Sequence, residues 1–277
     1  MASQARITKI LPQHYRYLQQ SVYSATGIVL EDGKEYLFES RLVPVAEHLG
    51  LASVNELCAT LQVSRNAVMT QMVAEAMTTN ETYFFREPVH YEAIKKVLLP
   101  KIVELRRDSK RMRFWSAASS TGQEAFSLAM MLAEEGLQDW NIEILGTDFC
   151  SKVVERARSG VFQQIEVNRG LPASLLVKYF HRSGLSWQLS DTVRRMTRFE
   201  TLDLRSSMRT LGPFDLVFCR NVMIYFDSDT KWRIIKEIHG TLFRGGWLIL
   251  GGAETCTCLG DYFEQQKIGN TTVYVAR

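Results

Sequence analysis

A loop of small residues near the middle of the chain is the first candidate for binding a ligand. It reads Trp115-Ser-Ala-Ala-Ser-Ser-Thr-Gly122, follows a predicted strand and precedes a predicted helix. Small side chains let a backbone approach a ligand closely, and the first N–H groups of a helix have no partners inside that helix. The loop is therefore expected to bind a nucleotide-like molecule.

The charge beside this loop distinguishes two classes of nucleotide. The loop lacks the Gly-x-Gly-x-x-Gly pattern typical of dinucleotide binding, and Glu124 lies in the first turn of the following helix. A carboxylate in that turn repels a pyrophosphate and attracts a cation. S-adenosylmethionine carries a sulfonium and an ammonium group and no phosphate, so it is favoured over NAD, which remains the rival cofactor.

Two further loops carry polar residues directly after apolar strands. Asp148 follows the predicted strand 142–147, where its carboxylate would accept hydrogen bonds from both ribose hydroxyls or would cap a helix that starts near Ser151. Both alternatives stay open. The run Arg220-Asn-Val-Met-Ile-Tyr-Phe226 follows the predicted strand 214–219. In doubly wound sheets, ligands bind at the carboxyl ends of strands where the strand order reverses.

The elements around these loops alternate between strands and helices. Apolar or β-rich runs predict strands over 112–117, 142–147, 214–219 and 247–250, and a closing hairpin over 263–268 and 272–275. Helices are predicted over 123–135 and 228–243, the second with Trp232, Ile235, Ile238 and Leu242 on its apolar face. Such alternation is typical of a mainly parallel sheet covered by helices on both sides.

The first eighty or so residues predict helices alone. Apolar residues three or four apart form two helical stripes, and a capping box at Ser53-Val-Asn-Glu56 begins a helix between them. The stripes are Phe38, Leu42, Val45 and Leu49, and then Val68, Met72, Ala76 and Met77. We predict a helical domain over 1–88, a linker helix over 89–111 and an α/β domain over 112–277, with a small β subdomain inserted at about 161–198.

Composition excludes several classes of protein. Of the 277 residues 46% are hydrophobic, yet the chain has no run of about 20 apolar residues and no apolar segment within Met1–Lys9. We therefore expect a soluble, cytoplasmic protein without membrane insertion. The formal charge of +3 is too small to indicate nucleic-acid binding. Basic residues gather between Lys95 and Arg113, either as a solvated helix face or as a surface for an acidic partner.

The cysteines indicate neither a disulfide framework nor a metal site. They are five in number and scattered, which suits a reducing compartment. Cys256-Thr-Cys258 has no second cysteine pair and no nearby histidine, whereas a zinc site needs about four ligands. No metal is predicted. The histidines are expected to be packing or surface residues: His14, His48, His90, His181 and His239.

Five segments taken together are specific to one family. They are Thr79–Glu87, Ser119–Glu124, Gly146–Asp148, Arg169–Pro172 and Phe218–Phe226. With them the chain resembles the chemotaxis receptor methyltransferase (CheR) family over nearly its whole length. The resemblance implies an α/β fold of the class I S-adenosylmethionine-dependent methyltransferases, Rossmann-like and doubly wound, with a helical N-terminal domain and an inserted small β subdomain.

The resemblance also implies an activity and a cofactor. Members of this family transfer a methyl group from S-adenosylmethionine to glutamate carboxylates of chemotaxis receptors, which yields glutamate methyl esters and S-adenosylhomocysteine during sensory adaptation. A glutamate carboxylate is ionised at neutral pH, so this reaction needs no general base. The expected protein residues are therefore groups that position the two reactants.

Matching positions assign roles to individual residues. For the cofactor they are Asn80, Thr82, Arg86, Gly122, Glu124, Asp148, Asp203, Leu204, Arg220 and Asn221. The resemblance places Glu124 near the methionine portion and Asp148 at the ribose. Arg86 and Tyr225 match positions near the transferred methyl, where they would act as catalytic positioning groups; Arg86 could instead form a salt bridge between the domains.

The chain departs from the family pattern at two places. The family usually has Asn where this chain has Asp203, and often Glu-Glu-Pro-Tyr where it has Gln123-Glu-Ala-Phe126. Asp203 keeps a hydrogen-bond acceptor and loses the amide donor, so a contact near the adenine is expected to differ. Cofactor binding is expected to survive both changes.

The family's substrate is the cytoplasmic domain of a methyl-accepting receptor, a helical and acidic bundle that a basic helix surface would recognise. Arg41, Arg65 and the Lys95–Arg113 cluster are candidates for this surface. Some relatives also hold a receptor C-terminal peptide through the β subdomain, but the compact run Phe180–Trp187 predicts no such tether. The alternative function is a catalytically idle, cofactor-binding module that regulates or scaffolds a signalling complex.

Overall fold

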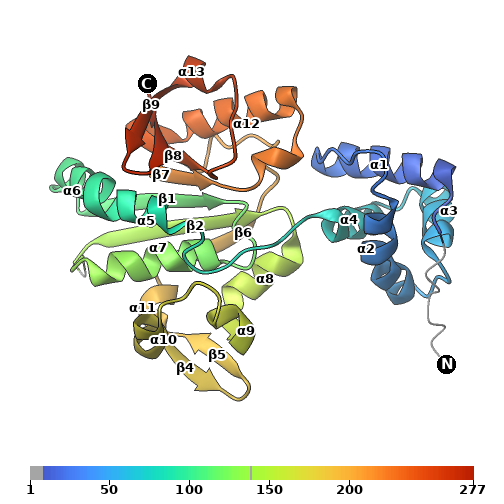
Figure 1. Cartoon of the computed structure of the whole chain (residues 1–277), viewed down its shortest axis with the longest axis horizontal. Helices are drawn as coiled ribbons and strands as arrows, with labels where there is room; N and C mark the ends of the chain where they lie inside the picture. The colour runs from blue at the N-terminus through green and yellow to red at the C-terminus, as the bar shows by residue number, and fades with distance from the viewer. Residues whose placement is uncertain (1–8, 138) are drawn as a thin grey trace. The chain divides into compact units, whose positions relative to one another are not determined.

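The computed structural model describes residues 9–137 and 139–277, which divide into two compact units. Within these residues the first unit contains residues 9–79 and Tyr225–Thr230, and the second contains Asn80–Ile224 and Lys231–Arg277. Figure 1 shows the elements of each unit. The sequence predicts no export segment within Met1–Lys9. Of these residues, only Lys9 lies in the described part of the chain.

The first unit consists of four helices around a small apolar core. They are α1 (Pro12–Thr26), α2 (Glu35–His48), α3 (Val54–Ser64) and α4 (Ala67–Met77). The predicted stripe on α2 is confirmed, because Phe38, Leu42 and Val45 are buried. The stripe on α4 is confirmed at Met77, which is buried, and at Met72 and Ala76, which pack against the core. It is wrong at Val68, which is 69% exposed, and it missed the buried Val73.

Two side chains fix the starts of these helices. The hydroxyl of Ser53 accepts a hydrogen bond from the Glu56 N–H at 3.2 Å, as a capping residue does. Asn66 caps α4 in the same way, because its side-chain oxygen accepts from Val68 N at 2.9 Å and Met69 N at 3.2 Å. The sequence between α3 and α4 therefore ends one helix and begins the next.

A short segment from far along the chain completes the first unit. Ile28 and Phe226 form an isolated antiparallel bridge, and Val29 N donates to Tyr225 O at 2.9 Å. The hydroxyl of Tyr23 donates to Asp227 Oδ2 at 2.6 Å. Residues 225–230 therefore pack with the N-terminal helices, although they follow a strand of the second unit.

The second unit is built on a seven-stranded sheet with the order β6-β2-β1-β7-β8-β10-β9. The strands are β1 (Arg111–Ala117), β2 (Asn141–Asp148), β6 (Thr197–Thr201), β7 (Phe214–Cys219), β8 (Leu242–Leu250), β9 (Phe263–Ile268) and β10 (Thr271–Ala276). Neighbouring strands from β6 to β8 in this order pair in parallel. The β9–β10 hairpin adds two antiparallel strands at the edge beside β8. The predicted doubly wound α/β sheet is confirmed.

Helices cover this sheet and bury its central strands. They are α5 (Pro88–Ala93), the π-helical η1 (Ile94–Leu98), α6 (Leu99–Arg106), α7 (Gln123–Glu134), α8 (Ser151–Ser159), α12 (Ser228–Gly240) and α13 (Leu259–Tyr262). Every residue of β7 is buried, as expected for a parallel strand covered on both faces. The strand order reverses between β1 and β7, so Ala117 and Cys219 end at the point where such sheets bind ligands.

A three-stranded antiparallel sheet with the order β3-β5-β4 lies apart from the large sheet (Figure 1). Its strands are β3 (Val161–Gln163), β4 (Phe180–Ser183) and β5 (Ser186–Leu189). Three short helices accompany them: α9 (Gln164–Val167), α10 (Ala173–Tyr179) and α11 (Asp191–Arg194). Phe84 packs edge-on against Phe162 and Phe180 at ring-centroid distances of 5.0 and 5.8 Å. Phe84 thus packs within the second unit, which begins at Asn80, while the predicted helical domain extends to residue 88.

Two local predictions fail in the second unit. Helix α12 ends at Gly240 rather than 243, because Leu242 begins β8, and Trp232 is 40% exposed while Ile234 and Ile238 are buried. The expectation of unpaired cysteines is also wrong at one site, since Cys256 and Cys258 form a disulfide. The remaining three, Cys58, Cys150 and Cys219, are buried and form no disulfide within the described part of the chain.

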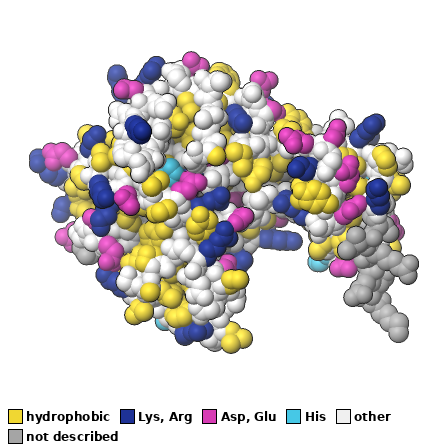
Figure 2. Space-filling model, in the orientation of Figure 1, with side chains coloured by type: hydrophobic (Ala, Val, Ile, Leu, Met, Phe, Trp, Pro, Cys, Tyr) yellow, Lys and Arg dark blue, Asp and Glu magenta, His cyan; other side chains and the backbone are white. Residues whose placement is uncertain are grey.

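Several members of the basic Lys95–Arg113 run form ion pairs inside the second unit. Arg106 contacts Asp215 at 2.7 Å and Arg113 contacts Glu143 at 2.9 Å, and both arginines are largely buried. Lys95 pairs with Glu135 at 2.5 Å. Figure 2 shows acidic and basic side chains intermixed on the face in view. A large part of this run therefore has a structural role.

No helix in the described residues combines the length and the apolar character that crossing a bilayer requires.

The tight contact between Gly146 of β2 and Phe199 of β6 leads to a first prediction. A Cβ atom on Gly146 would overlap the Phe199 ring. We expect Gly146→Ala to lower the free energy of unfolding by about 1–3 kcal/mol through overpacking. Urea denaturation measures this change. Gly240→Ala is the matched control, because a Cβ there meets nothing within 4 Å, and an equal loss in both variants would contradict the packing argument.

Candidate functional site

The loop between β1 and α7 makes a sharp, strained turn. Ala118, Ser120 and Gly122 all have positive φ values, of 58°, 50° and 92°. Only glycine adopts this region without steric cost, so the alanine and serine must be held in place by their surroundings. A Cβ on Gly122 would come within 2.9 Å of Phe126 and 3.0 Å of Phe199, so the turn also needs glycine for space.

Asp148 joins this loop to the end of β2. One carboxylate oxygen accepts from Ser120 N at 2.8 Å, and the other accepts from Cys150 N at 3.0 Å. The N-cap of α8 is Cys150 itself, so Asp148 stabilises the turn before the helix rather than capping it directly. Asp148 is buried, and the hydroxyl of Ser120 donates to Asn80 O at 2.7 Å. Asn80 and Asp148 therefore meet at the same loop.

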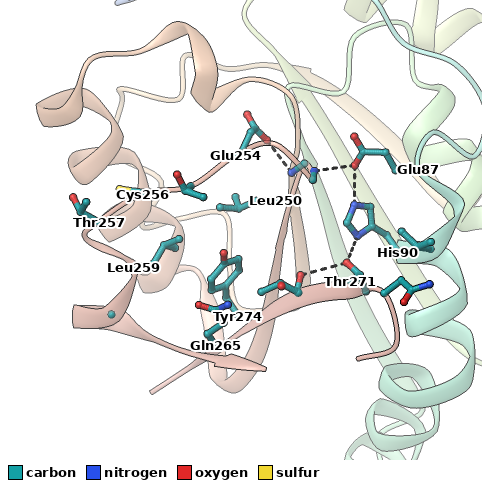
Figure 3. A pocket seen from close by; sticks show the side chains of 17 residues that line it. Glu87, His90, Leu250, Glu254, Cys256, Thr257, Leu259, Gln265, Thr271 and Tyr274 are labelled. Carbon is teal, nitrogen blue, oxygen red and sulfur yellow. Dashed lines mark hydrogen bonds and ion pairs between the residues drawn. The ribbon is translucent and has the colours of Figure 1, made fainter. Parts of the chain in front are cut away.

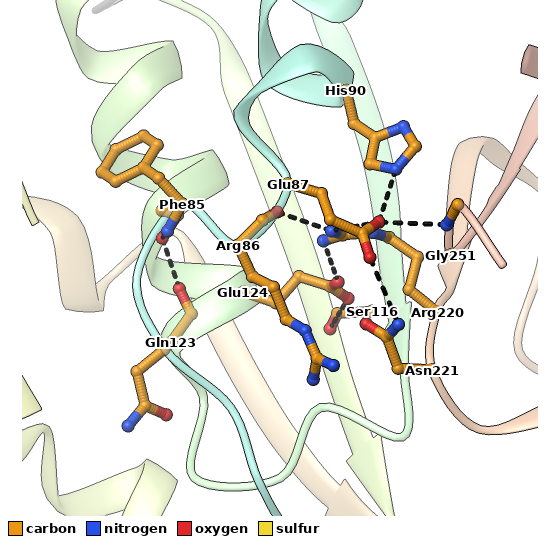
Figure 4. Close-up of polar contacts among 12 residues, drawn as sticks. Phe85, Arg86, Glu87, His90, Ser116, Gln123, Glu124, Arg220, Asn221 and Gly251 are labelled. Carbon is orange, nitrogen blue, oxygen red and sulfur yellow. Dashed lines mark hydrogen bonds and ion pairs between the residues drawn. The ribbon is translucent and has the colours of Figure 1, made fainter. Parts of the chain in front are cut away.

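Arg220 is buried between two carboxylates. Its guanidinium contacts Glu124 at 2.7 Å and Glu87 at 3.1 Å, and it donates to Arg86 O at 2.5 Å. Ser116 completes the group by donating its hydroxyl to Glu124 at 2.7 Å (Figure 4). We call Ser116, Glu87, Glu124 and Arg220 the Arg220 cluster. Burial alone would lower the pKa of Arg220, but the neighbouring Glu124 and Glu87 charges raise it.

Glu87 lies at the edge of this cluster in a strained conformation. Its φ is 55°, and its carboxylate accepts from His90 Nε2 at 2.8 Å and from Asn221 Nδ2 at 3.3 Å, as well as from Arg220. The hydrogen bond from His90 is the largest influence that holds the pKa of Glu87 well below its usual range; desolvation opposes it and Arg220 adds to it. Glu87 is therefore charged at neutral pH.

Sequence reasoning missed Glu254, which shapes the loop after β7. The buried carboxylate accepts hydrogen bonds from four backbone N–H groups: Asn221 at 2.6 Å, Met223 at 2.7 Å, Gly251 at 2.8 Å and Ile224 at 3.4 Å. These bonds hold Asn221 at a φ of 58°. One signal in the sequence could have identified Glu254: it is the single acid in the glycine-containing loop that follows the apolar strand 247–250.

His90 was also misjudged, because it is buried and takes part in the polar network rather than serving only as packing. Its Nε2 contacts Glu87 at 2.8 Å and its Nδ1 contacts the Thr271 hydroxyl at 2.7 Å. Glu87 belongs to the family segment Thr79–Glu87, but the sequence predicted no separate role for it. The contact with Thr271 has no short-range sequence signal, since Thr271 is 181 positions from His90, whereas Glu87 is only three positions away.

The other predicted cofactor residues reach the same edge of the sheet to different degrees. Leu202 N donates to Asp148 O at 2.9 Å, so Asp203 and the buried Leu204 directly follow a residue that contacts the end of β2. Asp203 forms an ion pair with Arg205 at 2.6 Å. Thr82 is half-buried, within the same segment as Asn80.

The two predicted catalytic residues fall in different units. Arg86 belongs to the second unit, where it donates to Glu81 O at 3.0 Å and its guanidinium carbon lies 5.7 Å from the centre of the Tyr83 ring. Among the described residues Arg86 forms no salt bridge within its own unit, and the alternative of an interdomain ion pair stays a prediction. Tyr225 belongs to the first unit, and its backbone carbonyl pairs with Val29.

The charges of the site suit a cationic ligand. Four carboxylates, from Glu87, Glu124, Asp148 and Glu254, stand against the guanidiniums of Arg220 and Arg86, a formal net charge of −2 at the carboxyl ends of the strands. The hydroxyl of Ser119 is buried here and has no hydrogen-bond partner among the described residues, so a polar ligand would satisfy it. These features fit S-adenosylmethionine.

The described residues contain no group of three His, Cys, Asp or Glu side chains placed to hold a metal ion.

Glu254 yields a second prediction. Glu254→Gln places an amide N–H against backbone N–H donors, so we expect stability to fall by about 1–3 kcal/mol. Because Asn221 then loses its fixed conformation, we expect S-adenosylhomocysteine to bind about tenfold more weakly. Thermal unfolding and calorimetry measure the two effects. The exposed Glu264 on β9 offers the control Glu264→Gln, and unchanged affinity in Glu254→Gln would contradict its assigned role.

Comparison with known proteins agrees with this geometry. Residues 13–78 match the family model described as "CheR methyltransferase, all-alpha domain", and residues 80–272 match "CheR methyltransferase, SAM binding domain". A relative from Pseudomonas aeruginosa, "Chemotaxis protein methyltransferase 1", is 37% identical over 257 residues, which cover 91% of this chain and 93% of the relative.

Two further relatives cover similar shares of the chain. "Chemotaxis protein methyltransferase" from Vibrio parahaemolyticus is 35% identical over 96% of this chain and 97% of its own length. The protein of the same name from Borreliella burgdorferi is 32% identical over 84% of this chain and 85% of its own length. The resemblance and the class I methyltransferase fold inferred from the sequence are thereby confirmed. The chain belongs to the CheR methyltransferase family, with the all-alpha domain of that family followed by its S-adenosylmethionine-binding domain.

Proposed function

We propose that this protein transfers the methyl group of S-adenosylmethionine to glutamate side chains in the cytoplasmic helices of chemotaxis receptors. The products are a glutamate methyl ester and S-adenosylhomocysteine. The observation that carries the proposal is the buried, net-negative site at the carboxyl ends of β1, β2 and β7 in a chain of the CheR family. The names of the relatives, all chemotaxis protein methyltransferases, support the receptor as substrate.

The proposed reaction requires positioning rather than proton transfer. Bound S-adenosylmethionine supplies a methyl group made electrophilic by the sulfonium. A carboxylate oxygen of the substrate forms a bond to this methyl as the carbon–sulfur bond breaks, and the bonding electron pair stays on sulfur. The glutamate, with an ordinary pKa of about 4.3, is already ionised, and both products are less charged than the reactants, so exclusion of water favours the step.

The residues divide between holding the cofactor and holding the acceptor. Asp148 is proposed to accept hydrogen bonds from the ribose hydroxyls, and the negative Arg220 cluster to favour the cationic end of the cofactor. Arg86 is proposed to hold the acceptor carboxylate, because it is a cation without an ion-pair partner among the described residues. Tyr225 is proposed to orient the same carboxylate or the sulfonium.

The remaining predicted cofactor contacts are proposed as a group: Asn80, Thr82, Gly122, Glu124, Asp203, Leu204 and Asn221.

The structure narrows the candidates for receptor docking. Arg41 donates to Met77 O at 2.7 Å and to Thr78 O at 3.2 Å, so its guanidinium secures the end of α4. Arg65 and the exposed members of the basic run, such as Lys101 and Lys110, remain candidates for contact with an acidic helix. A tether through the β subdomain stays predicted to be absent, and the cytoplasm stays the proposed compartment.

The decisive experiment incubates the protein with methyl-labelled S-adenosylmethionine and cytoplasmic fragments of candidate receptors. Label that alkali releases as methanol identifies a carboxyl methyl ester. Fragments with Gln in place of the acceptor Glu are the control, because an amide is a poor nucleophile. Alkali-stable label would contradict ester formation. Cofactor binding without label on any receptor fragment would favour the alternative of an idle regulatory module.

Arg86 provides the third prediction. Arg86→Ala removes the group proposed to hold the acceptor, so we expect kcat to fall by about 100-fold, as for a misplaced reactant. S-adenosylmethionine affinity is expected to stay within about threefold. Steady-state kinetics and calorimetry separate the two quantities. Arg244→Ala, at an exposed position of β8, is the control. Equal losses of affinity and turnover would show that Arg86 serves the cofactor alone.

A further inference from the structure

We propose that His90 is a positioning residue of the cofactor site: it holds the Glu87 carboxylate, which in turn holds Arg220 and Asn221, while Thr271 orients the imidazole. This role rests on the proposed binding of the cofactor beside Arg220 and Glu124. It does not depend on which molecule accepts the methyl group.

The proposal is based on a continuous chain of short contacts. From the β9–β10 hairpin inward, these are Thr271 to His90 at 2.7 Å, His90 to Glu87 at 2.8 Å and Glu87 to Arg220 at 3.1 Å. Arg220 then contacts Glu124 at 2.7 Å. Figure 3 shows the Glu87, His90 and Thr271 part of this chain, and Figure 4 shows the part from His90 to Glu124.

Hydrogen-bond chemistry determines the tautomer of the imidazole. Ionised Glu87 can only accept, so the proton lies on Nε2 of His90. In the neutral ring Nδ1 is then an acceptor, and the Thr271 hydroxyl donates to it at 2.7 Å. The other contact of that hydroxyl, to Thr272 O at 3.5 Å, is too long to compete. Thr271 therefore orients the ring with Nε2–H toward Glu87.

Glu87 needs this support because its backbone is strained. A non-glycine residue at a φ of 55° persists only when its surroundings hold it there. The Glu87 carboxylate also accepts from Gly252 N at 3.2 Å and Asn221 Nδ2 at 3.3 Å, both longer than the His90 contact. Loss of His90 would leave the shortest of these contacts unmade.

The other charges around Glu87 make its ionised state sensitive to His90. Arg220 faces it from the loop after β7, with Glu124 of α7 on the far side of the guanidinium. Glu254 approaches from the loop after β8 through the Asn221 backbone, and Tyr91 is the titratable neighbour on α5, with a pKa raised by burial. Arg220 is shared between Glu87 and Glu124, so the Nε2–H of His90 is the shortest further side-chain contact that stabilises the Glu87 charge, ahead of Asn221.

A cavity gives experimental access to this network. Glu87, His90 and Thr271 line a space of about 520 Å³ beside the β9–β10 hairpin (Figure 3). Removal of the imidazole in His90→Ala would enlarge this cavity at the point between Glu87 and Thr271. A molecule of imidazole from solution can then reach both partners.

The fourth prediction concerns cofactor affinity. We expect His90→Phe, which keeps a planar ring but has no donor, to bind S-adenosylhomocysteine about tenfold more weakly by calorimetry. His90→Gln retains a side-chain N–H and is expected to stay within about threefold. Thr271→Val is expected to lie between the two. Thr272→Val, which alters the neighbouring hydroxyl on the same strand, is the control and is expected to bind as the unaltered protein does.

The pH dependence distinguishes positioning from packing. The lowered pKa of Glu87 means that its charge persists at pH values below the ordinary glutamate range and is lost only as pH falls through the folded pKa. Without His90 that value rises, so we expect the acid limb of S-adenosylhomocysteine affinity in His90→Phe to move up by about one to two pH units. A packing defect would lower affinity by the same factor at every pH.

Chemical rescue completes the test. At a pH of about 8, where imidazole is largely neutral, added imidazole is expected to restore the affinity of His90→Ala. 1-Methylimidazole has no N–H to donate to Glu87 and is expected to fail. No rescue together with an unshifted acid limb would overturn the proposal, as would full affinity in His90→Phe. These measurements need no receptor, so their failure is distinct from a failure of receptor methylation.

Discussion

The site depends on one buried cation. Arg220 is 5% exposed, and its ion pairs with Glu124 and Glu87 connect α7, the strand β7 and the segment before α5. Transfer of a charge from water to a protein interior costs several kcal/mol unless partners surround it, so none of these elements can move away independently. Two acids for one base leave an excess of negative charge, and that excess suits a positively charged ligand.

The surrounding scaffold holds polar groups in conformations that they would not adopt alone. Ser120, Glu87 and Asn221 all have left-handed backbones. Ser120 and Asn221 are held by hydrogen bonds to the distant Asp148 and Glu254, and Glu87 is held by a hydrogen bond to the nearby His90. The strain is concentrated in the loops at the carboxyl ends of the strands, while the sheet below is regular and apolar. This division between a rigid sheet and constrained loops is how such folds hold a ligand in a fixed orientation.

The sequence predicted the sheet well because buried parallel strands appear as short apolar runs. The predicted 112–117 and 214–219 agree with β1 and β7 to within a residue. Leu242 was predicted to lie in the helix but begins β8. An apolar residue directly after a helix fits both the 3.6-residue repeat of a helix and the two-residue repeat of a strand. The contacts of His90 with Thr271 and of Glu254 with Asn221 were missed for a different reason: they span 181 and 33 positions, and hydrogen bonds over such separations leave no local pattern. The roles of Asn80 and Asp203 came from family resemblance and remain proposals.

The division of the chain at Ile224 has a consequence for protein engineering. The chain passes from the second unit to the first after Ile224 and returns after Thr230, so a six-residue excursion, Tyr225–Thr230, belongs with the N-terminal helices. Its partners there are Tyr23, Ile28 and Val29. An expression clone that begins at Asn80 would therefore leave this excursion without its packing surface and would expose Phe226, which is 9% exposed in the whole chain. The helical domain cannot be exchanged between relatives as a simple N-terminal cassette; a functional chimaera must also carry the matching loop.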